Sequence, residues 1–343
     1  MVAAATLLLA ACGGADDEDG ATAADGGEDG AAEAGEDLSQ DDLVAAAEEE
    51  GTLLWYSSLP EAVNDSVVSG FEEQYDIDVD YLRLVDGQLT QRFASEQSSG
   101  SSEVDFMNVA QRAFYTAALD EGWFATLDSS QVPSLGDWPE EAFFEDTYAL
   151  INVQPLGFAY NTDLVDSAPT DWSDLTSEEF ADGTLFGDPA IPAYLVLYDL
   201  WREELGDDYL EQLDALGLRV VDSMVPGAQQ LGAGEASMTI PALASVVQPM
   251  IDAGAPIEFV VPATTTGVEQ YGAVVENAPN HNSARLFMDY LLSAEGQQRL
   301  TAGLAASYLE DVDGAMELPA DYQRPREAEA LEREDETVAL LGL

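Results

Sequence analysis

The chain has 343 residues, with 68 Asp and Glu residues against 10 arginines and no lysine, which gives a net charge of −58. Without lysine it has no Walker-type phosphate loop and no Schiff-base chemistry, and one cysteine with one histidine cannot build a zinc site or a disulfide framework. Such a chain would repel nucleic-acid phosphates, so we expect no nucleic-acid binding. We interpret its acidity as adaptation to a salty exterior, where ions screen the repulsion.

The chain begins with an apolar run, residues 1–12, that is too short to span a bilayer and ends in small residues before Cys12. Leu9-Ala10-Ala11-Cys12 resembles the lipobox of bacterial lipoproteins, whose signal is removed just before a cysteine that becomes lipidated. The alternative is a free cysteine after an alanine-rich stub. Residues 13–40 carry ten acidic residues and no aromatic one, which predicts a disordered acidic linker.

From residue 41 the pattern alternates between helices and strands, since helical periodicity and short apolar runs follow one another. Helices are predicted at 41–50, 63–75 and 89–97, and strands at 52–56, 77–84 and 104–107. This order predicts an α/β fold with a doubly wound, mostly parallel sheet, in which ligands bind beyond the carboxyl ends of the strands. The segments that would form a site are 57–58, the residues after Arg83, and 108–112.

A second block begins near residue 149 with a long strand at 150–161 that crosses over. Further helices are predicted at 173–180, 194–205, 228–232 and 243–253, and strands at 219–221, 235–240 and 257–261. The chain then returns to the first block, with an amphipathic helical region at 284–302.

Several motifs occur in an order and spacing that resemble one protein family. They are the lipobox, Trp55-Tyr56-Ser57-Ser58-Leu59-Pro60, Phe71-Glu72 before Ile77-Asp78-Val79, Gly157-Phe158-Ala159-Tyr160-Asn161-Thr162-Asp163-Leu164-Val165, Pro169-Thr170-Asp171-Trp172-Ser173-Asp174-Leu175, Gly232-Ala233-Gly234-Glu235, Gly254-Ala255-Pro256, Pro279-Asn280-His281, and Leu286-Phe287 to Ser293-Ala294-Glu295-Gly296-Gln297. Together they make the chain similar to the extracellular substrate-binding proteins of bacterial ABC importers, in the ferric-iron-binding branch.

The resemblance implies a two-lobed fold of the type II periplasmic-binding-protein kind, with two crossover strands as the hinge. Lobe 1 would comprise 41–150 and 263–343, and lobe 2 would comprise 151–262. A small solute would bind in the cleft between the lobes, and closure would present it to the permease subunits of the importer. We therefore expect an extracytoplasmic, lipid-anchored monomer with no catalysis of its own.

Ferric iron is one candidate solute, and it prefers phenolate and carboxylate oxygens. Iron-binding members of the family use an adjacent Tyr-Tyr pair after the Gly-Glu motif, but here that stretch reads Ser237-Met238-Thr239-Ile240 and the chain has no Tyr-Tyr pair. Tyr160 fits one possible ligand position, and His281 falls in a predicted surface loop. We therefore expect no metal site and no cofactor, with Fe³⁺ kept as an alternative transported ligand through Tyr160.

A small organic or oxyanionic solute is the favoured ligand, because arginine can hold a carboxylate or phosphonate through two parallel hydrogen bonds. Arg83 and Arg112 each follow a predicted strand. Ser57 and Ser58 precede a helix and could either bind an anion or simply cap that helix. The other predicted ligand-binding residues are Tyr56, Asn108, Tyr160, Tyr194, Gln229 and Thr239. A cationic solute such as a polyamine would instead use acidic and aromatic side chains.

Two other functions fit the sequence less well. A secreted hydrolase with a Ser–His–acid triad would need His281 and a nucleophile elbow, and no Gly-x-Ser-x-Gly occurs. Paired carboxylates for glycoside hydrolysis remain open, although no spacing singles out a pair. A surface adhesion lipoprotein would favour repeats or an all-β pattern, and neither is present.

Overall fold

The computed structural model describes residues 39–181 and 183–343. The first part of the chain alternates helices and strands. It comprises α1 (Gln40–Glu50), β1 (Thr52–Ser57), α2 (Glu61–Gln74), β2 (Asp78–Arg83), α3 (Asp86–Ser99), β3 (Phe106–Val109), α4 (Arg112–Asp120), β4 (Phe143–Phe144) and β5 (Tyr148–Pro155). Helix α1 begins where the Ser39 hydroxyl accepts from the Asp42 amide at 3.3 Å, and it ends at Gly51, whose φ of 69° suits glycine.

The second part continues with a further set of elements. It comprises β6 (Gly157–Asn161), β7 (Thr184–Gly187), α5 (Pro192–Leu205), α6 (Asp207–Asp214), β8 (Arg219–Val221), α7 (Met224–Gly232), β9 (Met238–Ala242), α8 (Ala244–Asp252) and β10 (Ile257–Val260). The last part contains β11 (Thr264–Thr265), β12 (Gly267–Val274), α9 (His281–Leu292), α10 (Ala294–Thr301), β13 (Asp321–Tyr322), α11 (Glu327–Glu332) and α12 (Glu334–Leu340).

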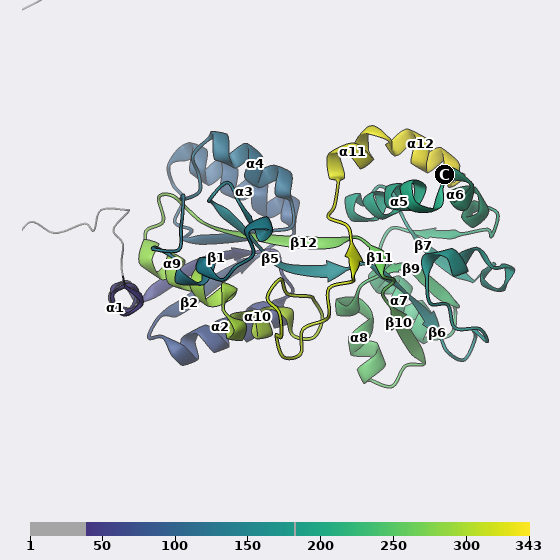
Figure 1. Ribbon diagram of the computed structural model, residues 1–343, viewed down its shortest axis with the longest axis horizontal. Helices are drawn as coiled ribbons and strands as arrows, with labels where there is room; N and C mark the ends of the chain where they lie inside the picture. Colours follow the sequence, from purple (N-terminus) through teal and green to yellow (C-terminus); the bar gives the residue numbers. More distant parts are fainter. Residues whose placement is uncertain (1–38, 182) are drawn as a thin grey trace, which may run out of the picture. The chain divides into compact units, whose positions relative to one another are not determined.

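The first lobe is built on a six-stranded sheet in the order β2-β1-β3-β12-β5-β4 (Figure 1). Strand β1 pairs in parallel with β2 and β3, whereas β12 runs antiparallel to both β3 and β5. Phe287 of α9 is fully buried in the core of this lobe, and its ring centroid lies 5.1–5.3 Å from the ring centroids of Trp55, Phe71 and Phe106. These aromatic contacts fix α9 on the sheet, because buried rings contribute both large apolar area and specific edge-to-face geometry.

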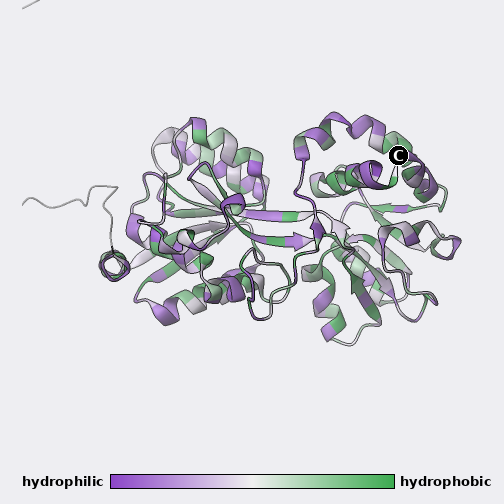
Figure 2. Ribbon diagram, viewed as in Figure 1, coloured by the Kyte–Doolittle hydropathy of each residue, from purple (hydrophilic) through white to green (hydrophobic). Residues whose placement is uncertain are grey.

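The second lobe is built on a five-stranded sheet in the order β10-β6-β9-β7-β8, with a hydrophobic core of its own. Strands β7, β8 and β9 pair in parallel, and β6 runs antiparallel to β9 and β10. Figure 2 shows hydrophobic residues interspersed with hydrophilic ones along the surface helices, as expected for helices that bury one face. The predicted α/β class and two-lobed organisation are confirmed.

Three connections join the lobes. The first runs from β5 to β6, and the second from β10 through β11 to β12; the Leu156 amide of the first donates to the Thr266 carbonyl of the second at 2.8 Å. The third is the C-terminal strap, residues 321–343, in which β13 pairs with β11 before α11 and α12 contact α5 (Figure 1). Residues 263–343 were expected to lie in the first lobe, and in the structure the strap ends on helices of the second.

Most predicted helices and strands occur within a few residues of their expected positions. The single strand expected at 150–161 is instead two, β5 and β6, separated at Leu156 where the chain passes between sheets. The helix expected at 173–180 is wrong in type: the structure has two short 3₁₀ turns, the first capped by the Asp171 side chain. Capping of this kind competes with a continuous α-helix.

The predicted lipobox at Cys12 and most of the acidic linker lie outside the described residues. In the part of the chain that the structure describes, no helix has the length and apolar character needed to cross a bilayer.

Candidate functional site

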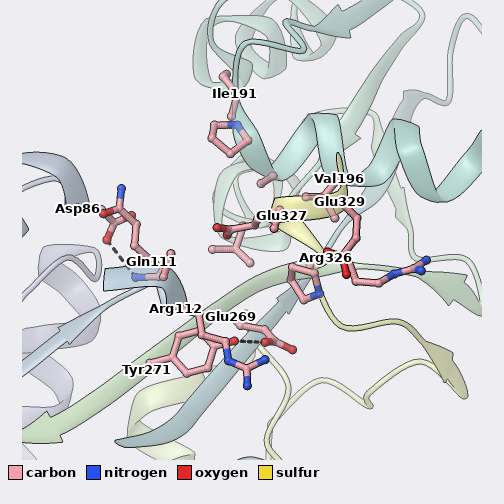
Figure 3. Close-up of a pocket in the computed structure, with 18 of the residues that line it drawn as sticks. Asp86, Gln111, Arg112, Ile191, Val196, Glu269, Tyr271, Arg326, Glu327 and Glu329 are labelled. Carbon is pink, nitrogen blue, oxygen red and sulfur yellow. Dashed lines mark hydrogen bonds between the residues drawn. The ribbon is translucent and has the colours of Figure 1, made fainter. Parts of the chain in front are cut away.

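A cavity of about 550 Å³ lies between the two lobes, and four separate parts of the chain line it. They are the start of α3, the start of α4, the start of α5, and the face that β12 forms with the strap (Figure 3). The lining residues used below are Asp86, Gln111, Arg112, Ile191, Pro192, Glu269, Tyr271, Glu327 and Glu329. Its volume is within the range of small-molecule sites, which are generally 300–1,000 Å³.

Two helix N-termini, those of α4 and α5, meet at this cavity from opposite lobes. The residues that precede these helices, Gln111 and Ile191, make no side-chain capping hydrogen bond, and neither helix has an acidic residue in its first turn. Helices α1, α2, α3 and α6 carry acidic residues there, whereas α7, α8 and α9, like α4 and α5, do not. The first turns of α4 and α5 therefore contain no acidic residue, although Asp86 accepts from the Ala110 amide just before α4. Because Pro192 has no N–H group, the groups suited to a bound anion are the first amides of α4 and, in α5, the amide of Ala193.

Arg112 adds a full positive charge at the start of α4. Its guanidinium carbon lies 4.4 Å from the ring centroid of Phe144, a cation–π contact that helps to orient the side chain. Among the described residues, no carboxylate oxygen lies within 4 Å of its nitrogens. In a chain with 68 acidic residues, an arginine in a cavity without a paired carboxylate is a strong candidate for binding an anionic group.

Carboxylates also line this cavity. Glu269 is 3% exposed and accepts from the hydroxyl groups of Tyr271 and Tyr322, and Arg324 lies 3.4 Å away. Asp86 accepts from the Ala110 amide at 3.1 Å. Burial, then the charges of Asp86 and Glu269, raise the pKa of Glu327, because ionised Glu327 is repelled by both. Figure 3 shows Glu269 beside Arg112 and Asp86 beside Gln111, so acidic groups and the arginine are neighbours around this cavity.

Of the ten ligand-binding residues predicted from the sequence, Arg112 lines this cavity. The other nine are within the described part of the chain and lie elsewhere. Arg83 is exposed, with its Nε donating to the Leu59 carbonyl at 3.3 Å. The Tyr56 hydroxyl donates to Glu96 at 3.0 Å. These contacts are local to the first lobe.

Ser57, Ser58 and Asn108 form part of a hydrogen-bond network at the ends of β1 and β3. Ser57 is fully buried and donates to Asn64 at 2.8 Å. Ser58 and Asn108 both donate to the Gln270 side chain, at 3.3 and 3.0 Å. This network ties β12 to the parallel strands of the first lobe.

The four predicted residues of the second lobe have separate environments. The Tyr160 hydroxyl donates to Glu258 at 2.6 Å, across the β6–β10 pair; burial, followed by this hydrogen bond, raises the pKa of Tyr160 to about 12. Thr239 donates to the Met224 sulfur at 3.3 Å. Tyr194 is 9% exposed on α5, and Gln229 is exposed on α7.

A protein-family model described as "Bacterial extracellular solute-binding protein" matches residues 103–332, about two thirds of the chain. The chain belongs to this family. Its members are solute-binding receptors rather than enzymes, act outside the cytoplasm, and deliver small-molecule solutes to ABC permeases.

Known proteins resemble this solute-binding protein in sequence and in fold. An uncharacterized protein from Haemophilus influenzae is 26% identical over 262 residues, which cover 73% of this chain and 75% of that protein. Iron-bound HitA from Pseudomonas aeruginosa matches with a TM-score of 0.66 and 19% identity, over 83% of this chain and 99% of its own. AfuA from Actinobacillus pleuropneumoniae, with bound fructose-6-phosphate, matches with a TM-score of 0.59 and 21% identity, over 85% and 97%.

The iron alternative is not favoured by the side chains of this solute-binding protein. Within residues 39–343, with residue 182 left aside, no group of three or more His, Cys, Asp or Glu side chains is placed to hold a metal ion. Tyr160, the residue that would have coordinated iron, is hydrogen-bonded to Glu258 and does not line the interlobe cavity.

Proposed function

We propose that this protein captures a small organic solute with an anionic group in the interlobe cavity and delivers it to the two permease subunits of an ABC importer. The observation that carries the proposal is the convergence on one cavity of the α4 and α5 N-termini with Arg112, an arginine that forms no ion pair among the described residues. The anionic group would accept from the Arg112 guanidinium and from amide groups at the helix ends. Lipidated Cys12 would hold the receptor, as a monomer, at the outer face of the membrane.

The carboxylates that line the same cavity favour an organic solute over a bare oxyanion such as inorganic phosphate. Asp86, Glu269 and Glu327 accept hydrogen bonds and repel a second negative charge. A solute whose far end carries hydroxyl or ammonium groups would satisfy these acceptors. Contacts with groups from both lobes would make the closed arrangement bind the solute better than a separated one, which is the condition for ligand-driven closure.

A thermal-shift experiment tests this proposal with defined compounds. Sugar phosphates, dicarboxylic acids and amino acids would each be compared with an uncharged counterpart and with inorganic phosphate. A ligand at about 100 times its dissociation constant stabilises the folded state by about 2.7 kcal/mol, which corresponds to a rise in melting temperature of about 5 °C or more. We expect at least one anionic organic compound to reach this value.

The matched variants are R112Q and R83Q, because both remove one arginine but only Arg112 lines the cavity. We expect R112Q to abolish the shift and R83Q to retain it. A shift of equal size in wild type and R112Q would refute the assigned role of Arg112.

A further inference from the structure

Ion pairs that involve several of the chain's few arginines hold the C-terminal strap against the rest of the protein. Arg324 pairs with Glu269 of β12, Arg326 with Glu203, and Arg333 with both Asp199 and Glu203 of α5. Arg202 of α5 pairs in turn with Glu336 of the strap at 3.2 Å. Four of the ten arginines therefore hold this segment, and residues 325–329 of the segment form part of the wall of the solute cavity.

A second, much smaller cavity lies beneath the strap where it leaves β12 and reaches α5. It measures about 10 Å³, which is enough for about one water molecule. Its lining residues are Val196, Asp199, Leu200, Thr266, Gln323, Arg324 and Arg326. They come from the second lobe, from the crossover before β12, and from the strap.

Three of these lining residues have buried polar atoms without a hydrogen-bond partner among the described residues. They are Oδ1 of Asp199, Oγ1 of Thr266 and one terminal nitrogen of Arg324, whose Nε is instead paired with Glu269 at 3.4 Å. The Asp199 and Thr266 residues are only 3% and 1% exposed. The second Asp199 oxygen already accepts from Arg333 at 2.5 Å, so Oδ1 is the part of this carboxylate left to be satisfied. Leaving such groups unpaired is costly, and native proteins rarely do so.

The chemistry of the three residues selects the molecule that would satisfy them. A cation would be repelled by Arg324 and Arg326, and an anion would be repelled by Asp199. A neutral molecule that both donates and accepts meets all three requirements, and the volume admits nothing larger than water. We infer that one ordered water molecule occupies this cavity, donating to Asp199 and Thr266 and accepting from Arg324.

This water would link the three segments on which the geometry of the hinge depends. The Thr266 carbonyl already accepts from Leu156 of the other crossover at 2.8 Å, and the Gln323 amide of the strap donates to the Thr265 carbonyl at 2.7 Å. The water would add a bridge from Asp199 of α5 to Thr266, next to these two hydrogen bonds. It is thus a structural ligand of the strap, and the inference holds whatever solute the larger cavity binds.

The direct test is a crystal structure of the full protein at a resolution near 1.5 Å. The expected result is a solvent peak within 3.2 Å of the Asp199, Thr266 and Arg324 atoms. Absence of that peak, or direct hydrogen bonds among the three side chains, would overturn the inference.

A substitution gives an independent test, because T266V keeps the shape of the side chain and removes only its hydroxyl group. If the water is present, T266V removes one of its partners, and the melting temperature should fall by about 2–4 °C. If the hydroxyl is unsatisfied, T266V removes a buried polar group and the melting temperature should rise, which would contradict the inference. T266S, which keeps the hydroxyl, measures the separate contribution of the methyl group.

Discussion

His281 is the only histidine of the chain, so the effect of its protonation on stability can be measured separately from that of the 68 acidic residues. His281 begins α9, and its Nε2 is buried without a partner among the described residues. Burial, then the charge of Arg285, lowers its pKa from 6.5 to about 4. The unfolded chain therefore binds a proton below pH 6.5 that the folded protein does not bind until about pH 4, so this residue makes stability fall as the pH falls through that window.

The magnitude follows from the two pKa values. Between pH 7.5 and pH 5 the loss of folding free energy from His281 is about 2 kcal/mol, and the limiting value below pH 4 is about 3 kcal/mol. Urea unfolding, followed by tryptophan fluorescence at constant ionic strength, measures it as the difference between wild type and H281Q. We expect the stability of H281Q to exceed that of the wild type by about 2 kcal/mol more at pH 5 than at pH 7.5. Parallel pH profiles for the two proteins would refute the reasoning.

Three substitutions test the packing described above, each by urea unfolding at pH 7.5 against the wild type. Phe287→Ala removes the buried ring at the centre of the first lobe and should cost about 3–5 kcal/mol; a loss under 1 kcal/mol would show that the aromatic cluster relaxes around the gap. Gly296→Ala would place a Cβ in steric overlap with the Tyr290 carbonyl oxygen and should cost about 1–3 kcal/mol, whereas a neutral effect would mean that the turn between α9 and α10 moves freely. Arg333→Leu leaves the Asp199 carboxylate without its ion-pair partner and should cost about 2–4 kcal/mol, with the exposed-pair variant R92L as a control near zero.

Most helices and strands could be predicted from the sequence because their signals are local and consistent, whereas the two-lobed organisation was predicted only from the family resemblance. The first lobe's helices and strands follow apolar periodicity, and Ser39 and Gly51 delimit α1 as capping residues should. Helices α11 and α12 were not predicted, because their acidic sequences carry little periodicity. Their position on α5 depends on ion pairs that Arg326 and Arg333 of the strap form with Glu203 and Asp199 of α5. The partners are far apart in the sequence, so no local pattern predicts these contacts.

Only the part of the candidate site that follows the strands of the first lobe could be expected from the sequence. Loops after the strands of a doubly wound sheet were expected to face a ligand, and Asp86 and Arg112 both lie after such strands and line the cavity. Ser57 and Asn108 lie in the same kind of position, but their side chains are used in a buried network with Asn64 and Gln270. Glu327 had no local signal, because it reaches the cavity through the strap from far along the chain.

The central claim is that the interlobe cavity holds a small organic solute through Arg112. It is tested most directly by native mass spectrometry of the purified protein after incubation with a defined metabolite library, with wild type and R112Q run in parallel. We predict one organic adduct per wild-type chain that is absent from R112Q. An adduct retained in both proteins, or an added mass matching one iron with the visible absorption of phenolate–iron bonding, would contradict the account.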